Sequence, residues 1–275
     1  MVTAIVTCCK RLHNVERIWE ALRGQSQPCE SVWFFYNGKE TLTRGDLPPF
    51  DRILRGDDPD DHYTRFAAAL AARTEYVFVI DDDCIPGTRW VENCLQAGRT
   101  RDGIFAPGGF RVTRPDFASG PYTREDQVGE LCRARTSRTL EVDVPFHSFF
   151  LRRKHLAWMF YDPMGVGLHE GRIVPTVGNE DVLLACRAWR RAGVRSWLPS
   201  CPEPGMEGAD EEIEELAYAN WVNRPNCNEE RIWALRYEVS LGWKPWLARG
   251  VPGLRRRRMR KRRARAEQRA RTARG

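Results

Sequence analysis

Residues 76–84 read YVFVIDDDC and carry the strongest structural signal in the chain. Tyr76 to Ile80 form a short, continuous apolar run, which favours a strand buried on both faces of a parallel sheet. Three aspartates, Asp81 to Asp83, follow at once. Adjacent carboxylates repel one another, and at the end of a buried strand they are costly unless a cation or hydrogen-bond donors compensate them. The stretch therefore predicts a buried strand that ends in a site for a positively charged partner.

The residues before this stretch alternate between strand and helix patterns. Strands are expected at 3–9, 31–36 and 52–54, and helices at 14–22, with Asn14 as N-cap, and at 62–73. Such alternation is typical of a parallel α/β sheet, in which ligands bind beyond the carboxyl ends of the strands. Thr7, Arg11 and Asn37 fall at these ends together with the aspartates. One nucleotide could touch all of them.

The second half of the chain is less regular. Strand character is expected at 103–112 and 142–150, and helices at 125–133, from Arg152, and at 180–192, 211–221 and 229–241, with a loop at 202–208. The fold class that follows is α/β: a mostly parallel central sheet flanked by helices, with a helical C-terminal part.

The composition is that of a globular protein, with 42% hydrophobic and 29% charged residues. No run approaches the roughly 18 apolar residues that a membrane helix needs. The apolar start, 1–9, is too short for a signal peptide, and its basic residues follow it. We therefore expect a cytoplasmic protein without a membrane span. Nine scattered cysteines, with no Cys-x-x-Cys pair, are expected to be reduced thiols.

The end of the chain is strongly basic. Residues 254–275 hold twelve Arg or Lys and one Glu, about +11, so the remaining residues carry about −4 of the total of +7. Such a segment binds polyanions through counterion release, so DNA, RNA and anionic membrane surfaces are candidate partners. The alternative is a solvated tail without a partner. We expect no packed structure in this segment, because a run of basic residues with so few large apolar side chains cannot build a core.

Three stretches together resemble one enzyme family. YVFVIDDDCIPGTRW (76–90), preceded by HYTRFAAALAAR (62–73) and TAIVTCCKR (3–11), is similar to GT-A glycosyltransferases, especially glycosyltransferase family 2. GNEDVLLACRAWRRAG (178–193) looks like the family's Glu-Asp motif at a helix start. The resemblance implies a GT-A, Rossmann-like domain over 1–253, with a nucleotide-sugar half (1–100) and an acceptor half (101–253), followed by the basic tail.

The same resemblance assigns a reaction and its cofactors. A single sugar would pass from a nucleotide-diphosphate sugar, with a UDP-sugar preferred, to a hydroxyl acceptor, with Mn²⁺ or Mg²⁺ bound. The resemblance assigns Asp83, with Asp81, to the metal. Asp81 would also contact the ribose or base side of the donor, and Asp82 could take part in metal binding or in that contact. Arg65 would contact the diphosphate or pair with the acidic residues 57–61. Thr7, Arg11 and Asn37 are weaker candidates for the donor site.

The second acidic pair suits the acceptor. The attacking hydroxyl must lose a proton, so an inverting enzyme places a carboxylate there as general base. We expect Asp181 to be that base and Glu180 to orient the acceptor, although acidic residues are also common at helix starts for electrostatic reasons alone. The segment is also similar to the Asn-Cys-Glu-Asp-Ile stretch of the retaining exostosin-like glycosyltransferases, so the stereochemistry stays open.

Two departures from the family pattern concern the metal and the acceptor. No histidine follows His169 to complete a metal shell, so phosphates, water or Glu207 are the expected further ligands. His147 and His169 are candidates for acceptor contacts. The Gln-x-x-Arg-Trp motif of processive synthases is missing, which favours single transfer.

The basic tail suggests a nucleic-acid acceptor, such as a hydroxymethylated base in DNA. The alternatives are a protein or glycan acceptor, or a nucleic-acid-binding protein whose GT-A body is inactive. A nucleotidyltransferase would need a Gly-rich loop after the first strand, and TCCKRLHN offers none.

Overall fold

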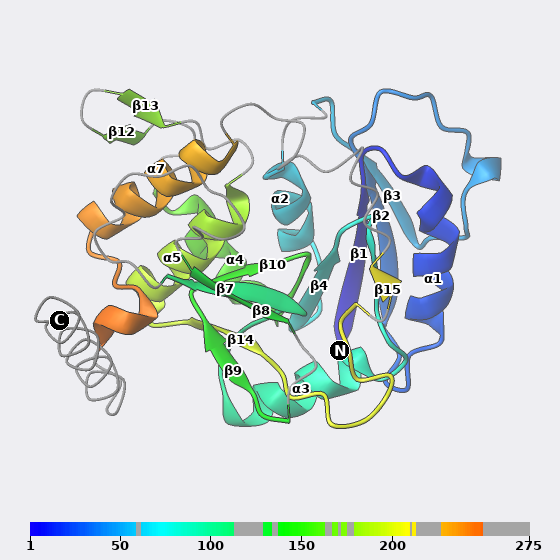
Figure 1. Ribbon diagram of the computed structural model, residues 1–275. Helices are drawn as coiled ribbons and strands as arrows, with labels where there is room; N and C mark the ends of the chain where they lie inside the picture. Colours follow the sequence, from blue (N-terminus) through cyan, green and yellow to red (C-terminus); the bar gives the residue numbers. More distant parts are fainter. Residues whose placement is uncertain are drawn as a thin grey trace, which may run out of the picture.

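The computed structural model describes residues 1–58, 62–112, 129–133, 137–162, 167–169, 172–174, 179–209, 211–212 and 227–249. An eight-stranded sheet forms the centre, in the order β3-β2-β1-β4-β11-β6-β14-β9 (Figure 1). Its strands are β1 (Val2–Cys8), β2 (Ser31–Tyr36), β3 (Arg52–Arg55), β4 (Tyr76–Ile80), β6 (Gly103–Phe105), β9 (Leu140–Val142), β11 (Ser148–Arg152) and β14 (Arg195–Leu198). The basic segment 254–275 lies outside the described residues.

The first four strands of the sheet are parallel neighbours. β1 pairs in parallel with β2 and β4, and β2 with β3. β14 is parallel to β6, whereas β11 runs antiparallel to both β4 and β6, and β9 antiparallel to β14. Parallel pairs thus outnumber antiparallel ones, and the predicted α/β class is confirmed. The antiparallel direction of β11 was not predicted, and it determines which residues lie beside the end of β4.

Helices cover both faces of the sheet. One face packs on α1 (Val15–Arg23) and α3 (Trp90–Thr100), and the other on α2 (Thr64–Leu70), α4 (Arg153–Leu156) and α5 (Glu180–Ala192). Alternate residues of one strand serve the two faces, because side chains point to opposite sides with a period of two. Along β4, for example, Phe78 joins the first cluster while Val77 and Val79 join the second. The result is a three-layer α/β/α arrangement.

A smaller sheet lies beside the central one. It contains β10 (Val144–Phe146), β7 (Gly108–Val112) and β8 (Gly129–Arg133), all antiparallel. Its apolar residues pack with α5 and with α7 (Cys227–Ser240) in a separate hydrophobic cluster. This packing brings α7 alongside α5 (Figure 1). Two short pairs complete the strands: β12 (Gly167–His169) with β13 (Arg172–Val174), and β5 (Cys84–Ile85) with β15 (Glu211–Glu212).

Four short helical turns complete the described elements. These are the 3-10 helices η1 (Leu12–Asn14), η2 (Arg44–Asp46), η3 (Ala157–Phe160) and η5 (Trp246–Arg249). η1 leads directly into α1, so this part of the chain becomes helical two residues before the predicted start.

Several local predictions were wrong. The expected strand at 103–112 is two strands in different sheets, β6 and β7, and the one at 142–150 is divided among β9, β10 and β11. The described end of the expected helix at 125–133 is strand β8, and Glu211–Glu212, the start of another expected helix, is strand β15. The rest of those two helices lies outside the described residues. In each case pairing with a distant strand outweighs local helix propensity.

Asn14 does not cap its helix. It has a helical backbone and makes no side-chain cap hydrogen bond; its amide instead donates to the carbonyl of Asp82 at 2.9 Å. Asn14 is therefore a link between the first helix and the aspartate triplet. The capping prediction failed because the local sequence does not distinguish an asparagine that caps a helix from one that donates to a distant residue.

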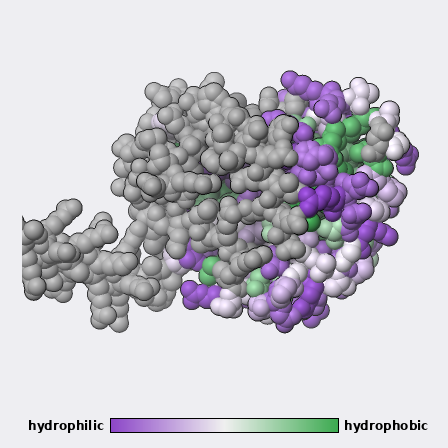
Figure 2. Space-filling model, turned by 45° about the vertical axis from the view of Figure 1, so that its right-hand side comes forward, coloured by the Kyte–Doolittle hydropathy of each residue, from purple (hydrophilic) through white to green (hydrophobic). Residues whose placement is uncertain are grey.

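On the face shown in Figure 2, the described residues are mostly hydrophilic and surround a smaller apolar area. The strongly exposed large apolar side chains of the described residues, Met1, Ile53, Tyr161 and Leu241, are separated in sequence. Within the described residues, no helix has the length and apolar character to span a bilayer. None of the seven cysteines whose side chains are described is part of a disulfide.

Candidate active site

The predicted site residues gather where β4 ends. Asp81 to Asp83 leave the carboxyl end of β4, and Thr7 and Asn37 lie at the corresponding ends of β1 and β2. Carboxyl ends of parallel strands meet at one edge of the sheet, which is why these distant residues are neighbours. Helix α2 contributes Arg65 from one side of the sheet.

Arg65 joins the two acidic segments. Its guanidinium is buried and donates to Asp81 Oδ1, to Glu180 Oε1 at 2.9 Å and to Thr7 Oγ1 at 3.3 Å. Asp81 ends β4, whereas Glu180 begins α5, so a single side chain contacts both. A planar guanidinium with several N–H donors is suited to such bridging. Of the two roles expected for Arg65, the structure shows an acidic pairing, but with Asp81 and Glu180 rather than with residues 57–61.

Asp82 holds the loop after β1. Its Oδ2 accepts hydrogen bonds from the backbone N–H groups of Cys9, Lys10 and Arg11 at 3.1, 3.3 and 3.2 Å, and its Oδ1 accepts one from Arg11 Nη1 at 2.7 Å. Only 7% of Asp82 is exposed. Three successive N–H groups turned toward one oxygen form an anion-binding turn, here filled by the protein's own carboxylate. Asp82 thus shapes the loop that carries Arg11.

Asp83 is partly exposed at the end of the triplet. Its side chain is 20% exposed, and its Oδ2 is 3.5 Å from Arg11 Nη1. The thiol of Cys84 donates to its Oδ1 at 3.4 Å. Ligand atoms of Asp83, Cys84 and His147 all lie within 4.8 Å of one another. The described residues place neither Asp81 nor Glu207 in this group, so the nearest ligand partners of Asp83 differ from those expected.

Thr7 and Asn37 are buried at the strand ends. Thr7 Oγ1 donates to the carbonyl of Ile80 at 2.9 Å, which ties β1 to the last residue of β4. Asn37 donates from its backbone to Cys8 at 3.1 Å and from its side chain to the carbonyl of Asp58 at 3.4 Å. Both residues therefore lie at the predicted edge of the sheet. Their contact with a nucleotide stays a prediction.

The acidic start of α5 contains two differently bound carboxylates. Asp181 is buried: its Oδ1 accepts the N–H of Val182 at 2.7 Å, and its Oδ2 accepts a hydrogen bond from Arg231 Nη2 at 2.8 Å. Glu180 is bonded to Arg65 through Oε1, while its buried Oε2 has no hydrogen-bond partner within the described part of the chain. Glu180 therefore has an acceptor position open, and Asp181 has an arginine partner.

Burial changes the acidity of this pair. It raises the pKa of Asp181 to about 6, although the nearby Arg231 opposes the rise. For Glu180 the effect of burial is outweighed by His62 and Arg65, so its pKa is lowered. Burial likewise raises the pKa of Asp81, against the effect of Arg65. The pKa of Glu180 is thus shifted in favour of its ionised form, and the pKa of Asp181 in favour of its protonated form.

Arg231 was missed by the sequence analysis and comes from α7. That helix is attached to α5 by Glu238, a fully buried carboxylate that accepts hydrogen bonds from Arg187 Nε at 3.2 Å and Arg190 Nε at 3.3 Å. Arg187 also donates to the carbonyl of Met159 at 2.7 Å. This ion-pair network links α7 to α5. No local pattern in 227–241 distinguishes Arg231 from Arg236, the other arginine of that segment.

Proteins similar to this chain were found among the solved structures. No protein-family model matches the chain, and no curated protein sequence is similar to it. Among the similar solved structures is the crystal structure of TarS from S. aureus, with a TM-score of 0.47 and 13% sequence identity. The likeness covers 74% of this chain and 36% of that one, so this chain spans about a third of the length of TarS. A likeness at this level assigns no activity.

Proposed function

We propose that the protein is a glycosyltransferase that moves a single sugar from a nucleotide-diphosphate sugar to a hydroxyl acceptor. The observation that carries the proposal is the position of Arg65, which contacts both the aspartate triplet and Glu180. A transfer reaction needs donor and acceptor groups within bonding reach of each other. The shared contact with Arg65 supports the proposal because the two acidic segments, which resemble glycosyltransferase motifs, are almost a hundred residues apart in the chain.

The donor would bind along the strand ends. Thr7, Arg11 and Asn37 would lie near the base and ribose, together with Asp81, and Asp82 would hold the loop that carries Arg11. A UDP-sugar is the donor that we prefer. A divalent cation held by Asp83 would neutralise charge on the departing diphosphate. The carboxylate of Asp83, the thiol of Cys84 and the imidazole of His147 are groups that bind divalent cations, so these residues fit such an ion.

The acceptor would bind at the start of α5. The acceptor oxygen forms a bond to C1 of the sugar while the bond from C1 to the diphosphate oxygen breaks, and the hydroxyl proton passes to Asp181. A pKa near 6 makes Asp181 a carboxylate at neutral pH that still binds a proton readily. The Oε2 of Glu180 would accept a hydrogen bond from the acceptor molecule and so orient it. Arg231 would keep Asp181 in place.

The acceptor that we propose is a hydroxymethylated base in DNA, with the basic segment 254–275 bound to the phosphates. The segment supports this by its charge of about +11 against a mildly acidic remainder. A protein or glycan acceptor would leave the segment without a role in transfer. Since nucleic acid is a cytosolic polyanion, this acceptor also agrees with the expected cytoplasmic location.

A screen of nucleotide sugars tests the activity. The full chain is incubated with each donor and either Mn²⁺ or Mg²⁺, with and without hydroxymethylated DNA, and released nucleoside diphosphate is measured. We expect release from one donor class, accelerated by the modified DNA but not by unmodified DNA. The matched control is Asp83→Ala. Release in neither protein, together with intact DNA binding, would support an inactive GT-A body and contradict the proposal.

A further inference from the structure

Three potential metal ligands of different chemistry surround one point beside the triplet. A carboxylate oxygen of Asp83, the thiol of Cys84 and a ring nitrogen of His147 lie within 4.8 Å of one another. We propose that they form a three-ligand oxygen, sulfur and nitrogen site for a borderline transition-metal ion, such as Co²⁺ or Zn²⁺, in preference to Mg²⁺. The proposal rests on the proposed function for the role of the ion, but not for its binding.

His147 reaches this place through the antiparallel strand. It is the single residue between β10 and β11, and β11 pairs with β4 so that Ser148 lies opposite Ile80. The N–H of Asp81 donates to the carbonyl of His147 at 3.3 Å. The residue that follows β4 is thereby bonded to the residue that precedes β11. Because each of these two residues adjoins one of two paired strands, the backbone of His147 lies next to that of Asp81.

The backbone of His147 is in the left-handed region. Its φ of 74° makes it the one residue other than glycine with positive φ among the described residues. This conformation is uncommon for side chains with a Cβ and tends to occur at functional sites, where the surroundings enforce it. A glycine would adopt it more readily. The presence of a histidine here is consistent with a role for its ring, and the ring lies beside Asp83 and Cys84.

The ligand types favour one class of ion. Mg²⁺ prefers an octahedral shell of oxygen atoms, whereas thiolate and imidazole ligands favour later, softer ions. Three protein ligands with one position left for water or a substrate oxygen are typical of metal sites that act on substrates. Asp83 is partly exposed, so the fourth position would face the side where the diphosphate is proposed to bind. On binding, the thiol of Cys84 would lose its proton to solvent.

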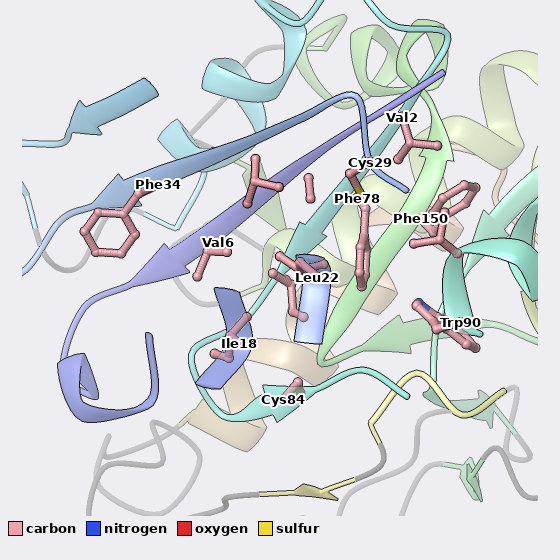
Figure 3. Packing of buried hydrophobic residues seen from close by; sticks show 14 of the residues in the cluster. Val2, Val6, Ile18, Leu22, Cys29, Phe34, Phe78, Cys84, Trp90 and Phe150 are labelled. Atoms are coloured by element: carbon pink, nitrogen blue, oxygen red, sulfur yellow. The ribbon is translucent and has the colours of Figure 1, made fainter. Parts of the chain in front are cut away.

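The competing interpretation is that Cys84 is an ordinary core thiol. It is fully buried and belongs to the cluster that packs β1, β2 and β4 on α1. Figure 3 shows it beneath Ile18 and Leu22 of α1. Cys94 is an equally buried thiol of the same cluster, but it is not a member of the Asp83 group. Cys94 therefore provides a matched control.

Cobalt titration of the full chain tests the site without any sugar donor. After treatment with a chelator, Co²⁺ is added and the absorption spectrum is recorded. Sulfur ligation produces a thiolate-to-cobalt charge-transfer band in the near ultraviolet, and we expect that band in the wild-type protein and in Cys94→Ser. It should be absent from Cys84→Ser. A large excess of Mg²⁺ should not remove the bound Co²⁺.

A second variant covers the case in which Cys84→Ser fails to fold. His147→Gln changes a partly exposed side chain, and it should weaken Co²⁺ binding by about 10-fold or more, since metal affinity depends strongly on each ligand. Circular dichroism checks that each variant is folded. An unchanged Co²⁺ affinity in His147→Gln, or a wild-type spectrum without the charge-transfer band, would overturn the proposal.

The two proposals fail in different ways. If the protein gives a charge-transfer band but releases no diphosphate from any donor, the metal site is supported and the proposed function is contradicted. Donor turnover with Mg²⁺, in a protein that gives no such band, would support the transferase and overturn the mixed-ligand site.

Discussion

Arg65 Nη2 donates a hydrogen bond to Glu180 Oε1 at 2.9 Å, and these residues are 115 positions apart in the chain. The same guanidinium contacts Asp81. One buried cation therefore compensates a carboxylate of the triplet and a carboxylate of α5 together. This arrangement ties the proposed donor side to the proposed acceptor side, so a change in Arg65 should affect both.

Arg65→Met should destabilise the protein and stop transfer. Removing one partner of a buried ion pair leaves uncompensated charge, which costs about 3–5 kcal/mol. Asp81 and Glu180 would both lose their shared cation, and their pKa values would rise. Thermal unfolding and donor turnover measure the two effects. The control is Arg52→Ala, because Arg52 is an exposed arginine on β3. Equal unfolding temperatures for Arg65→Met and wild type would contradict the bridging role.

Asp82 and Asp83 should respond differently to substitution by alanine. Asp82→Ala removes the acceptor of three backbone N–H groups and of Arg11, and should lower the free energy of unfolding by about 2–3 kcal/mol. Asp83→Ala should leave stability within about 0.5 kcal/mol, since the side chain is partly exposed, and should abolish metal-dependent turnover.

Urea unfolding and diphosphate release separate the two aspartates. Exposed Glu16, replaced by alanine, provides the baseline for a carboxylate without these contacts. The assignment of Asp82 to the loop would be wrong if its alanine variant were as stable as that of Asp83.

The transfer rate should fall as pH decreases through about 6. Asp181 must be deprotonated to accept the proton of the acceptor, and burial raises its pKa to about 6, so the protonated and inactive form accumulates below that pH. Asp181→Asn should reduce kcat by about 10²–10⁴-fold and abolish this limb of the pH profile. Donor binding, measured by calorimetry, should change little.

Glu180→Gln is the matched variant for the pH experiment. It retains a side-chain oxygen that can accept a hydrogen bond, so it should raise KM for the acceptor and leave the pH limb in place. A profile in which Glu180→Gln, rather than Asp181→Asn, abolishes the limb would transfer the role of base to Glu180.

Glu238→Ala should loosen α7 and, through it, Asp181. The substitution leaves Arg187 buried without its carboxylate, which should lower the free energy of unfolding by about 3–5 kcal/mol. Because Arg231 belongs to the same helix, kcat should also fall, although Glu238 itself contacts Arg187 and Arg190 rather than the aspartate triplet. Glu20→Ala, a substitution of an exposed glutamate on α1, serves as the control for stability. Loss of stability without any change in kcat would show that Arg231 does not depend on this network.

Deletion of residues 254–275 tests the proposed acceptor. The segment supplies about +11 of charge, so its removal should weaken DNA binding by at least about 10-fold at low salt and flatten the dependence of affinity on salt. Fluorescence anisotropy with a labelled duplex, over a range of salt concentrations, measures both. An unchanged affinity would remove the main support for a nucleic-acid acceptor.

Much of the fold follows from local patterns. The strand Tyr76–Ile80 and the helix Glu180–Ala192 were predicted with the observed bounds, because an apolar run before three aspartates and an amphipathic run after an acidic pair are strong signals over short distances. The position of Thr7, Asn37 and the triplet at one sheet edge also followed, since parallel strands align their carboxyl ends. The split of 142–150 did not, because residues 140–152 form three strands that pair with different partners.

The partners of the site residues required the packed chain. Nothing in the local sequence shows that Asp82 turns toward the loop after β1, that Asn14 donates to Asp82, or that Arg231 reaches Asp181. The place of His147 depends on β11 running antiparallel to β4. Hydrophobic periodicity reports which face of an element is buried, but which donor meets which carboxylate depends on strand pairing and helix packing between residues far apart in the chain. The strand Tyr76–Ile80 and the helix Glu180–Ala192 follow from the local sequence, whereas the chemistry of the site arises from long-range contacts.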